Sequence, residues 1–195
     1  NSTERMNRQN SLYCFPLGHL RATYSPMPRR WKLLLWIGSL SIIADQLTKY
    51  WARANFTEGV TEPFIEGYWD FTLAWNKGSA FSMFENLGNG RIFLSIVALI
   101  AIGAIISMVH KAEDKQTGFI VALSLMAGGA IGNVIDRMYF GKVTDFVLWK
   151  YNDHRWPVFN VADIALVVAV GLFVIVAIKD WKAQKAEGID AQTSK

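Results

Sequence analysis

Long apolar runs separated by polar connections dominate the pattern of this chain. Four such runs lie at about 31–50, 92–109, 118–138 and 161–178. Each approaches the ~20 residues that a helix rising ~1.5 Å per residue needs to cross ~30 Å of hydrocarbon. Lys32, Asp45 and Lys49 interrupt the first run, but both lysines lie near its ends, where long side chains reach the interface. The pattern therefore predicts four transmembrane helices in a single domain.

Two of the connecting segments have the two-residue period of a β-strand. In residues 68–84 the apolar Phe71, Leu73 and Trp75 alternate with smaller or polar residues, and an NKG turn at 76–78 precedes a second β-rich stretch. Residues 139–149 are also β-rich, with a bend at Gly141 and Lys142. We expect a small extracytoplasmic β-sheet at the membrane surface.

Aromatic residues are frequent in and around these segments. The tryptophans concerned are Trp51, Trp69, Trp75, Trp149 and Trp156. They are typical of an interfacial belt, where amphipathic rings lie at headgroup level. A groove that holds a lipid tail is the alternative interpretation.

Composition supports the membrane interpretation. Of 195 residues, 52% are hydrophobic and only 18% are charged, which is less charge than a soluble domain of this size usually carries. A soluble protein with four helices this apolar would need a larger polar shell than the chain supplies. Cys14 is the only cysteine, so an intrachain disulfide is excluded.

The net charge is +4, and the cationic residues are concentrated in particular segments beside the apolar runs. This distribution predicts a membrane orientation rather than a nucleic-acid partner. Cations flank the first run, fill the second connection and follow the last run: Arg29, Arg30, Lys32, Lys111, Lys115, Lys179, Lys182 and Lys185. The positive-inside rule places them in the cytoplasm, together with both termini. Segments 52–90 and 139–160 then lie outside.

This orientation divides the chain into three parts. Residues 1–26 are polar and irregular, which is typical of a flexible extension or leader. Residues 27–182 form the four-helix membrane domain, and 183–195 form a cytoplasmic tail.

Acidic side chains converge on the outer ends of the predicted helices. Asp45, Asp136 and Asp163 lie at helix ends, and Asp145 lies in the outer segment before the last helix. Acids in or near a span are functional candidates. For Asp45 and Asp136 a helix cap or an ion pair is the structural alternative, and Asp163, alone in an apolar run, requires a partner.

Amides, a cation and glycines accompany these acids. Asn133, Arg137 and Asn160 share their level, and the two asparagines alternatively bond loop backbone. Gly128 and Gly132 have the G-x-x-x-G spacing that allows close helix contact.

Two carboxylates at close range favour one reaction in particular. They cannot both ionise easily, so the pair shares a proton and titrates as a unit. The ionised member takes a proton from water, and the protonated member polarises a carbonyl and assists the leaving amine. This is aspartic peptide hydrolysis without a metal or other cofactor, although the residues alone do not choose Asp145 over Asp136 as the partner of Asp163.

Other chemistries have less support in the sequence. Of the histidines His19, His110 and His154, only the last lies on the acid-rich face, which disfavours a Ser–His triad or a zinc site. An all-carboxylate metal site stays open. A proton-coupled transporter or channel with the acids as a relay is the main functional alternative, and a non-catalytic assembly subunit is another. Transporter sites usually lie near the midplane on broken helices, unlike these acids.

Five motifs, in order, give the chain a family resemblance. They are DQLTK (45–49), NKGSAFS (76–82), GGAIGNVIDR (128–137), VTDF (143–146) and FNVAD (159–163). Through them, about 28–182 of the chain resembles the bacterial lipoprotein signal peptidases (signal peptidase II). Thr144 departs from the family, in which valine is frequent at that position.

The resemblance implies an inner-membrane aspartic endopeptidase, and we expect a monomer because no second recognition surface is evident in the sequence. Its substrates are diacylglyceryl-modified prolipoproteins, cut on the amino side of the lipidated cysteine. The family's catalytic acids correspond to Asp145 and Asp163. Supporting or substrate-binding roles then fall to Asp45, Lys49, Asn76, Gly78, Asn133, Asp136, Arg137 and Asn160, with Asn76 expected to bond substrate backbone.

Overall fold

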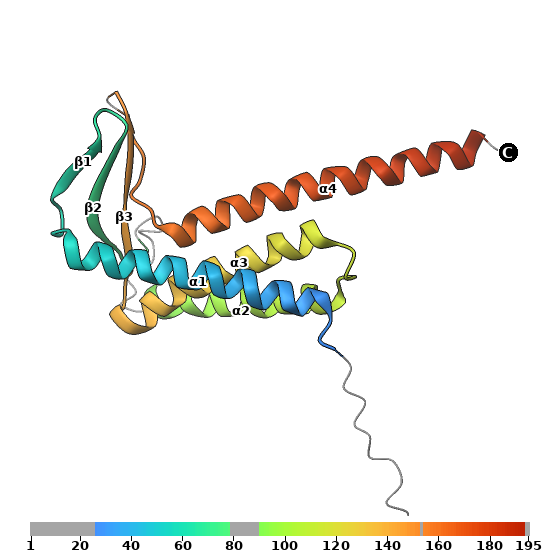
Figure 1. Ribbon diagram of the computed structural model, residues 1–195, viewed down its shortest axis with the longest axis horizontal. Coiled ribbons are helices and arrows are strands. Elements are labelled where there is room, and N and C mark those ends of the chain that lie inside the picture. The colour runs from blue at the N-terminus through green and yellow to red at the C-terminus, as the bar shows by residue number, and fades with distance from the viewer. Residues whose placement is uncertain (1–25, 79–89, 153, 194–195) are drawn as a thin grey trace, which may run out of the picture.

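The computed structural model describes residues 26–78, 90–152 and 154–193. The elements within these ranges are α1 (Arg29–Asn55), β1 (Thr61–Ile65), β2 (Trp69–Asn76), α2 (Gly90–Lys111), α3 (Thr117–Phe140), β3 (Val143–Tyr151), β4 (His154–Arg155) and α4 (Val161–Thr193). Helix α3 packs against α1, α2 and α4, and the sheet stands at one end of this bundle (Figure 1). The expected extension at 1–26, apart from its last residue, and the second β-rich stretch at 79–84 lie outside the described residues.

Three of the described helices are long and apolar enough to cross a membrane. They are α2, α3 and the first 26 residues of α4, Val161–Ala186. Helix α1, with 27 residues, is long enough but falls short in apolarity, because charged side chains lie along it. The predicted helices are all present, and the prediction of a span is confirmed for three of them.

Glycines set the close approach of α3 to its neighbours. A Cβ at Gly128 would lie 2.9 Å from the carbonyl oxygen of Gly38 on α1, and one at Gly132 would lie 2.5 Å from Asp45 Oδ2. On another side of α3, a Cβ at Gly129 would lie 2.7 Å from the carbonyl oxygen of Ala162. These contacts confirm the predicted close packing and bring backbone and carboxylates of three helices together.

The sheet is antiparallel in the order β1-β2-β3-β4. Strand β2 pairs with β3 so that Ala74 faces Asp145 and Asn76 faces Val143. The strand expected at 139–149 begins later, because Tyr139 and Phe140 form the last turn of α3. Gly141 ends that helix in the left-handed conformation, with φ 74°, which glycine adopts without strain.

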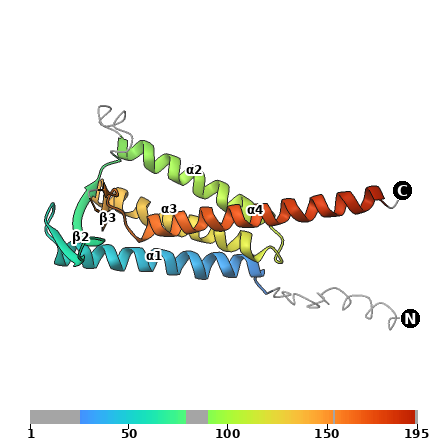
Figure 2. The ribbon, with the colours of Figure 1, turned by 90° about the horizontal axis from the view of Figure 1, so that it is seen from above.

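Helix α1 continues to Asn55, beyond the end expected at residue 50. Its last turns therefore reach the sheet, where Trp51 packs edge-on against Phe56 and Phe71. Figure 2 shows the sheet closing the same end of all the helices, and α4 extending past the others at the opposite end. Trp149 and Trp156 are exposed at the sheet, and their place in an interfacial belt stays a prediction.

Candidate active site

Four elements supply the polar side chains at the junction of bundle and sheet. Asp145 lies on β3, and Asp163 lies in the first turn of α4. Asn133 comes from α3, Asn76 ends β2, and Asn160 immediately precedes α4. The expected gathering of Asp145, Asp163 and the two later asparagines is present, and Asn76 joins them.

Each of the two acids accepts hydrogen bonds from two N–H groups. Asp145 accepts from the Asn160 side chain at 2.6 Å and from the Asn76 side chain at 3.0 Å, one on each oxygen. Asp163 accepts from the Asn133 side chain at 3.0 Å and from the backbone N–H of Asn160 at 3.2 Å. Asn160 therefore donates to both acids and holds them in one cluster.

The three asparagine amides are held in a single orientation, because the oxygen of each accepts from a fixed donor. Lys49 Nζ donates to Asn133 Oδ1 at 2.9 Å, and an ammonium group can only donate. The backbone N–H of Asp163 donates to Asn160 Oδ1 at 3.0 Å. Each amide nitrogen is thereby turned toward a carboxylate.

The third asparagine depends on a glycine. The backbone N–H of Gly78 donates to Asn76 Oδ1 at 2.7 Å. Gly78 has φ 92°, and a Cβ there would collide with Leu94 on α2. Glycine is thus required at 78 for both conformation and space, which gives a physical reason for its place in the motif.

A second cluster of charge adjoins the asparagine amides through Lys49. Lys49 Nζ lies 2.8 Å from Asp45 Oδ2 and 3.7 Å from Asp136 Oδ2, and none of these side chains is exposed. Arg53 Nη1 lies 3.7 Å from Asp136 Oδ1. The pairing compensates buried charges that would otherwise be costly.

Burial and charge act together on Asp145. The residue is only 2% exposed, and its pKa is raised from 3.8 to about 7, first by burial and then by the charge of Asp163. The amide donors Asn76 and Asn160 and the charge of Lys49 act in the opposite direction. Near neutral pH, Asp145 therefore holds a proton in a substantial part of the molecules, as acid catalysis requires.

Arg137 follows Asp136 in the chain but makes its contacts elsewhere. The cations at ion-pair distance from Asp136 are Lys49 and Arg53. Arg137 donates instead to the backbone oxygen of Asn133 at 3.5 Å, and it interacts electrostatically most strongly with Asp163. Asp136 is therefore paired with Lys49 and Arg53, which come from α1, and Arg137 lies on the side of Asp163.

Two polar residues of the site were missed by sequence reasoning. Arg53 Nη1 donates to Thr144 Oγ1 at 2.8 Å, and Gln46 Nε2 donates to Asp45 Oδ2 at 3.1 Å. The available signal for Arg53 was the four-residue spacing from Lys49, which places both on one helix face. The sequence hides this signal because the apolar run ends at residue 50, whereas α1 continues to Asn55.

The described residues offer no set of ligands for a metal ion. No group of three or more His, Cys, Asp or Glu side chains is arranged there to hold an ion. The carboxylates are directed instead at asparagine amides, backbone N–H groups, Lys49 and Arg53.

The comparisons with known proteins agree on one family of membrane peptidases. The family described as signal peptidase (SPase) II matches residues 37–179. Among curated relatives, the lipoprotein signal peptidase of Geobacter metallireducens is 35% identical over 161 residues, which is 83% of this chain and 99% of that protein. The lipoprotein signal peptidase of Maridesulfovibrio salexigens is 37% identical over 142 residues, which is 72% of this chain and 90% of that protein.

Solved structures agree with the sequence relatives. A bacterial membrane enzyme determined by the in meso method at 1.9 Å resolution has a TM-score of 0.70 and 30% identity, covering 76% of this chain and 94% of that one. The chain therefore belongs to the signal peptidase II family, whose members are aspartic peptidases. The family and the apolar helices fit a bacterial membrane protein.

Proposed function

We propose that this chain removes signal peptides from diacylglyceryl-modified prolipoproteins, cutting on the amino side of the lipidated cysteine with Asp145 and Asp163 as the catalytic residues. The single observation that carries the assignment of the dyad is that Asn160 donates to both acids. Asp136, the competing acid, accepts instead from the backbone of Thr144 and pairs with cations. Those contacts favour a supporting role for it.

The dyad acts with one proton between its members. Asp145 donates its proton toward the carbonyl oxygen while ionised Asp163 takes a proton from the attacking water, giving a gem-diol. Asp163 then passes that proton to the departing cysteine nitrogen, and the gem-diol returns one to Asp145 as the C–N bond breaks. The amide donors hold both carboxylates in place throughout.

The depth of the site suits a substrate that is itself a membrane helix. Asp163 lies at the start of the apolar part of α4, and Asp145 lies on the sheet that stands beyond it. Water is available at this level but scarce at the bilayer midplane. A lipidated cysteine at the outer end of a signal helix would bring the scissile bond to the same height.

We infer that α1 is the fourth span, despite its charges. Asp45 and Lys49 are fully buried against neighbouring helices and paired with each other, so they add little polarity to the lipid-facing surface. The exposed positions of that stretch of α1 include Trp36, Leu40 and Leu47. Such a face suits lipid.

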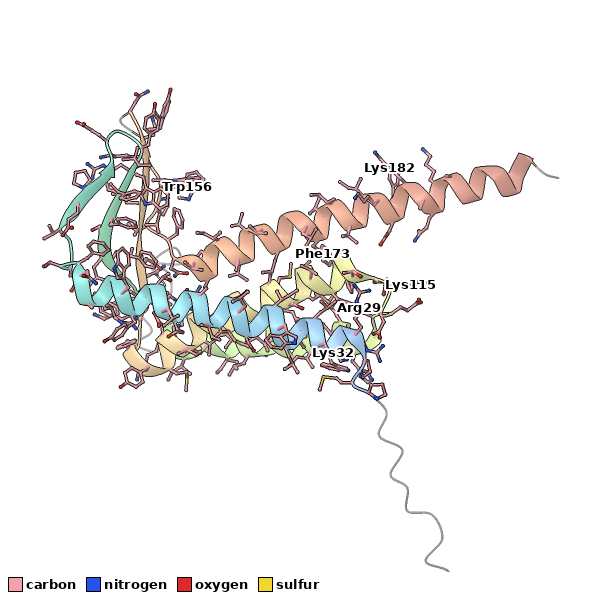
Figure 3. The ribbon with its side chains drawn as sticks, viewed as in Figure 1. Arg29, Lys32, Lys115, Trp156, Phe173 and Lys182 are labelled. Carbon is pink, nitrogen blue, oxygen red and sulfur yellow. The ribbon has the colours of Figure 1, made fainter. Side chains whose placement is uncertain are left out.

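The distribution of cations supports a cytoplasmic location for the end opposite the sheet. Figure 3 shows Arg29, Lys32 and Lys115 gathered at that end, with Lys182 on the part of α4 that extends beyond the other helices. Trp156 lies at the sheet end. We therefore place the active site on the outer face of the inner membrane, with both ends of the membrane domain in the cytoplasm.

One role expected from the sequence, that of Asn76, is refined. The Asn76 side chain donates to Asp145 through its nitrogen and accepts from the Gly78 backbone through its oxygen. We therefore propose that it orients Asp145 rather than bonding substrate backbone. We propose that residues 27–182 act as a monomeric membrane domain.

A cleavage assay with purified protein in detergent tests this function. The substrates are two forms of one prolipoprotein, with and without the diacylglyceryl group. Mass spectrometry identifies the products and the cleaved bond. We expect cleavage of the lipidated form alone, immediately before its cysteine. Cleavage at another bond, or equal cleavage of both forms, would contradict the proposed substrate class.

A further inference from the structure

A buried carboxylate fixes the backbone next to Asp163. The N–H of Ala162, one residue earlier, donates to Asp45 Oδ1 at 2.9 Å. Asp45 belongs to α1, and Ala162 is 1% exposed at the start of α4. The position of Asp163 is therefore tied to α1 and not only to its own helix.

The same arrangement occurs next to Asp145. The N–H of Thr144, again one residue earlier, donates to Asp136 Oδ2 at 2.8 Å. Asp136 is fully buried near the end of α3, and Thr144 is fully buried in β3. Each acid of the dyad thus follows a residue whose backbone is held by a buried carboxylate of another element.

One ammonium group joins the two anchors. Lys49 Nζ lies 2.8 Å from Asp45 Oδ2 and 3.7 Å from Asp136 Oδ2. It also donates to Asn133 Oδ1 at 2.9 Å. Its whole side chain is buried, so neither water nor lipid competes for these contacts.

We propose that Lys49, Asp45 and Asp136 form a clamp that sets the separation of the two catalytic acids. The inference rests on the proposed function, since it assigns Asp145 and Asp163 as the dyad. The three clamp residues are positioning residues, which act through the backbone of the preceding positions. Lys49 has a second effect, because it also orients the Asn133 amide toward Asp163.

A purely structural role would show differently from a clamp. Breaking any buried ion pair lowers stability, because a charge is left without a partner. A clamp additionally predicts that the folded variant reacts slowly, since small misplacements of reacting groups cost up to ~100-fold in rate. The turnover number of folded protein therefore separates the two roles, whereas the unfolding temperature does not.

The decisive variant is Lys49→Met with Asp45→Asn. It removes one cation and one anion together, leaves Asp136 paired with Arg53, and keeps an acceptor for the Ala162 N–H. We expect kcat for the lipidated prolipoprotein to fall by at least ~30-fold with KM within about twofold, because geometry at the dyad is lost while the substrate surface is kept. Wild-type kcat in the folded double variant would overturn the clamp.

The matched control breaks an ion pair at the other end of the bundle. Arg30→Met with Asp114→Asn removes the pair between α1 and the α2–α3 connection, where Arg30 Nη1 lies 3.4 Å from Asp114 Oδ1. We expect unchanged kcat in this variant. An equal fall of kcat in both double variants would mean that loss of stability alone explains the effect and would overturn the clamp.

A single substitution tests the clamp if the double variant does not fold. Asp45→Asn alone keeps Lys49 paired with Asp136 and is expected to lower kcat by about tenfold at constant KM. Unchanged kcat there would overturn the clamp even if the double variant were lost. Cleavage by the wild-type protein, abolished in Asp145→Asn, keeps the proposed function standing whatever the clamp variants show.

Discussion

The Asn160 side chain donates to Asp145 Oδ1 over 2.6 Å, the shortest of the amide contacts to either acid. The backbone N–H of the same asparagine donates to Asp163 at 3.2 Å. Asn160 is fully buried, and its Oδ1 accepts in turn from the Asp163 backbone. One residue therefore couples an acid on the sheet to an acid on a membrane helix.

Replacing Asn160 tests this coupling. Asn160→Ala removes the side-chain bond to Asp145 and leaves the carboxylate partly unpaired, so we expect kcat to fall by about 100-fold. Asn55→Ala is the control, because Asn55 is an exposed amide on the last turn of α1 that donates to the backbone oxygen of Trp51. Activity within a few-fold of wild type in Asn160→Ala would show that the coupling is dispensable.

The raised pKa of Asp145 predicts the alkaline side of the pH profile. The reaction requires the proton that Asp145 holds, and its pKa is about 7 in the free protein. We expect kcat/KM to fall ~10-fold per pH unit above that value, because this ratio reports the free enzyme. Initial rates from pH 5 to about 10 give the profile, and a flat profile through pH 8 would contradict the assignment of the acid.

The raised pKa of Asp145 also predicts how the stability of the protein changes with pH. Because burial and Asp163 raise the pKa of Asp145 from 3.8 to about 7, the unfolded chain ionises first as pH rises. Wild type therefore loses stability between pH about 4 and 7, and the loss is constant above that range. Asp145→Asn cannot titrate, so its unfolding temperature relative to wild type should increase with pH across this window. A difference that stays constant or decreases would contradict the raised pKa.

Much of this fold was predictable, because the apolar runs and the alternating strand of 69–76 have unambiguous periods. The end of helix α1 was the exception, since charges interrupt its apolar run and the helix continues beyond Lys49. Those charges are accommodated only because α3 and α4 bring partners to them, which is a tertiary effect. Strands β1 and β4, short and mostly exposed, left no readable pattern.

Most members of the polar cluster were predictable from the sequence, but Gln46, Arg53 and the contacts between the members were not. Convergence of the acids followed from topology, whereas the choice between Asp136 and Asp145 needed the family resemblance. The difference is visible in contacts: Asp136 meets the Thr144 N–H and two cations, and Asp145 meets two amides. Such partners depend on the register of β3 and the rotation of α1, which local sequence does not encode.

Gly78 offers a test of the turn that orients Asn76. Gly78→Ala places a methyl group against Leu94 at φ 92°, so the turn shifts and the Asn76 oxygen loses its donor. We expect a fall in kcat of about tenfold or more, since Asp145 then loses a fixed donor. Gly67→Ala is the control, because Gly67 has a similar φ of 83° but open space around it and lies in the distant β1–β2 turn. Equal losses in both would assign the effect to general backbone strain.

The central claim is that Asp145 and Asp163 act as one catalytic pair, and single-turnover cleavage by their asparagine variants tests it most directly. A single turnover measures the chemical step even when product release is slow. Circular dichroism and unfolding curves establish that each variant is folded. We predict that Asp145→Asn and Asp163→Asn each abolish cleavage of the lipidated prolipoprotein while Asp114→Asn cleaves at the wild-type rate. Cleavage at the wild-type rate by either folded dyad variant would contradict the account.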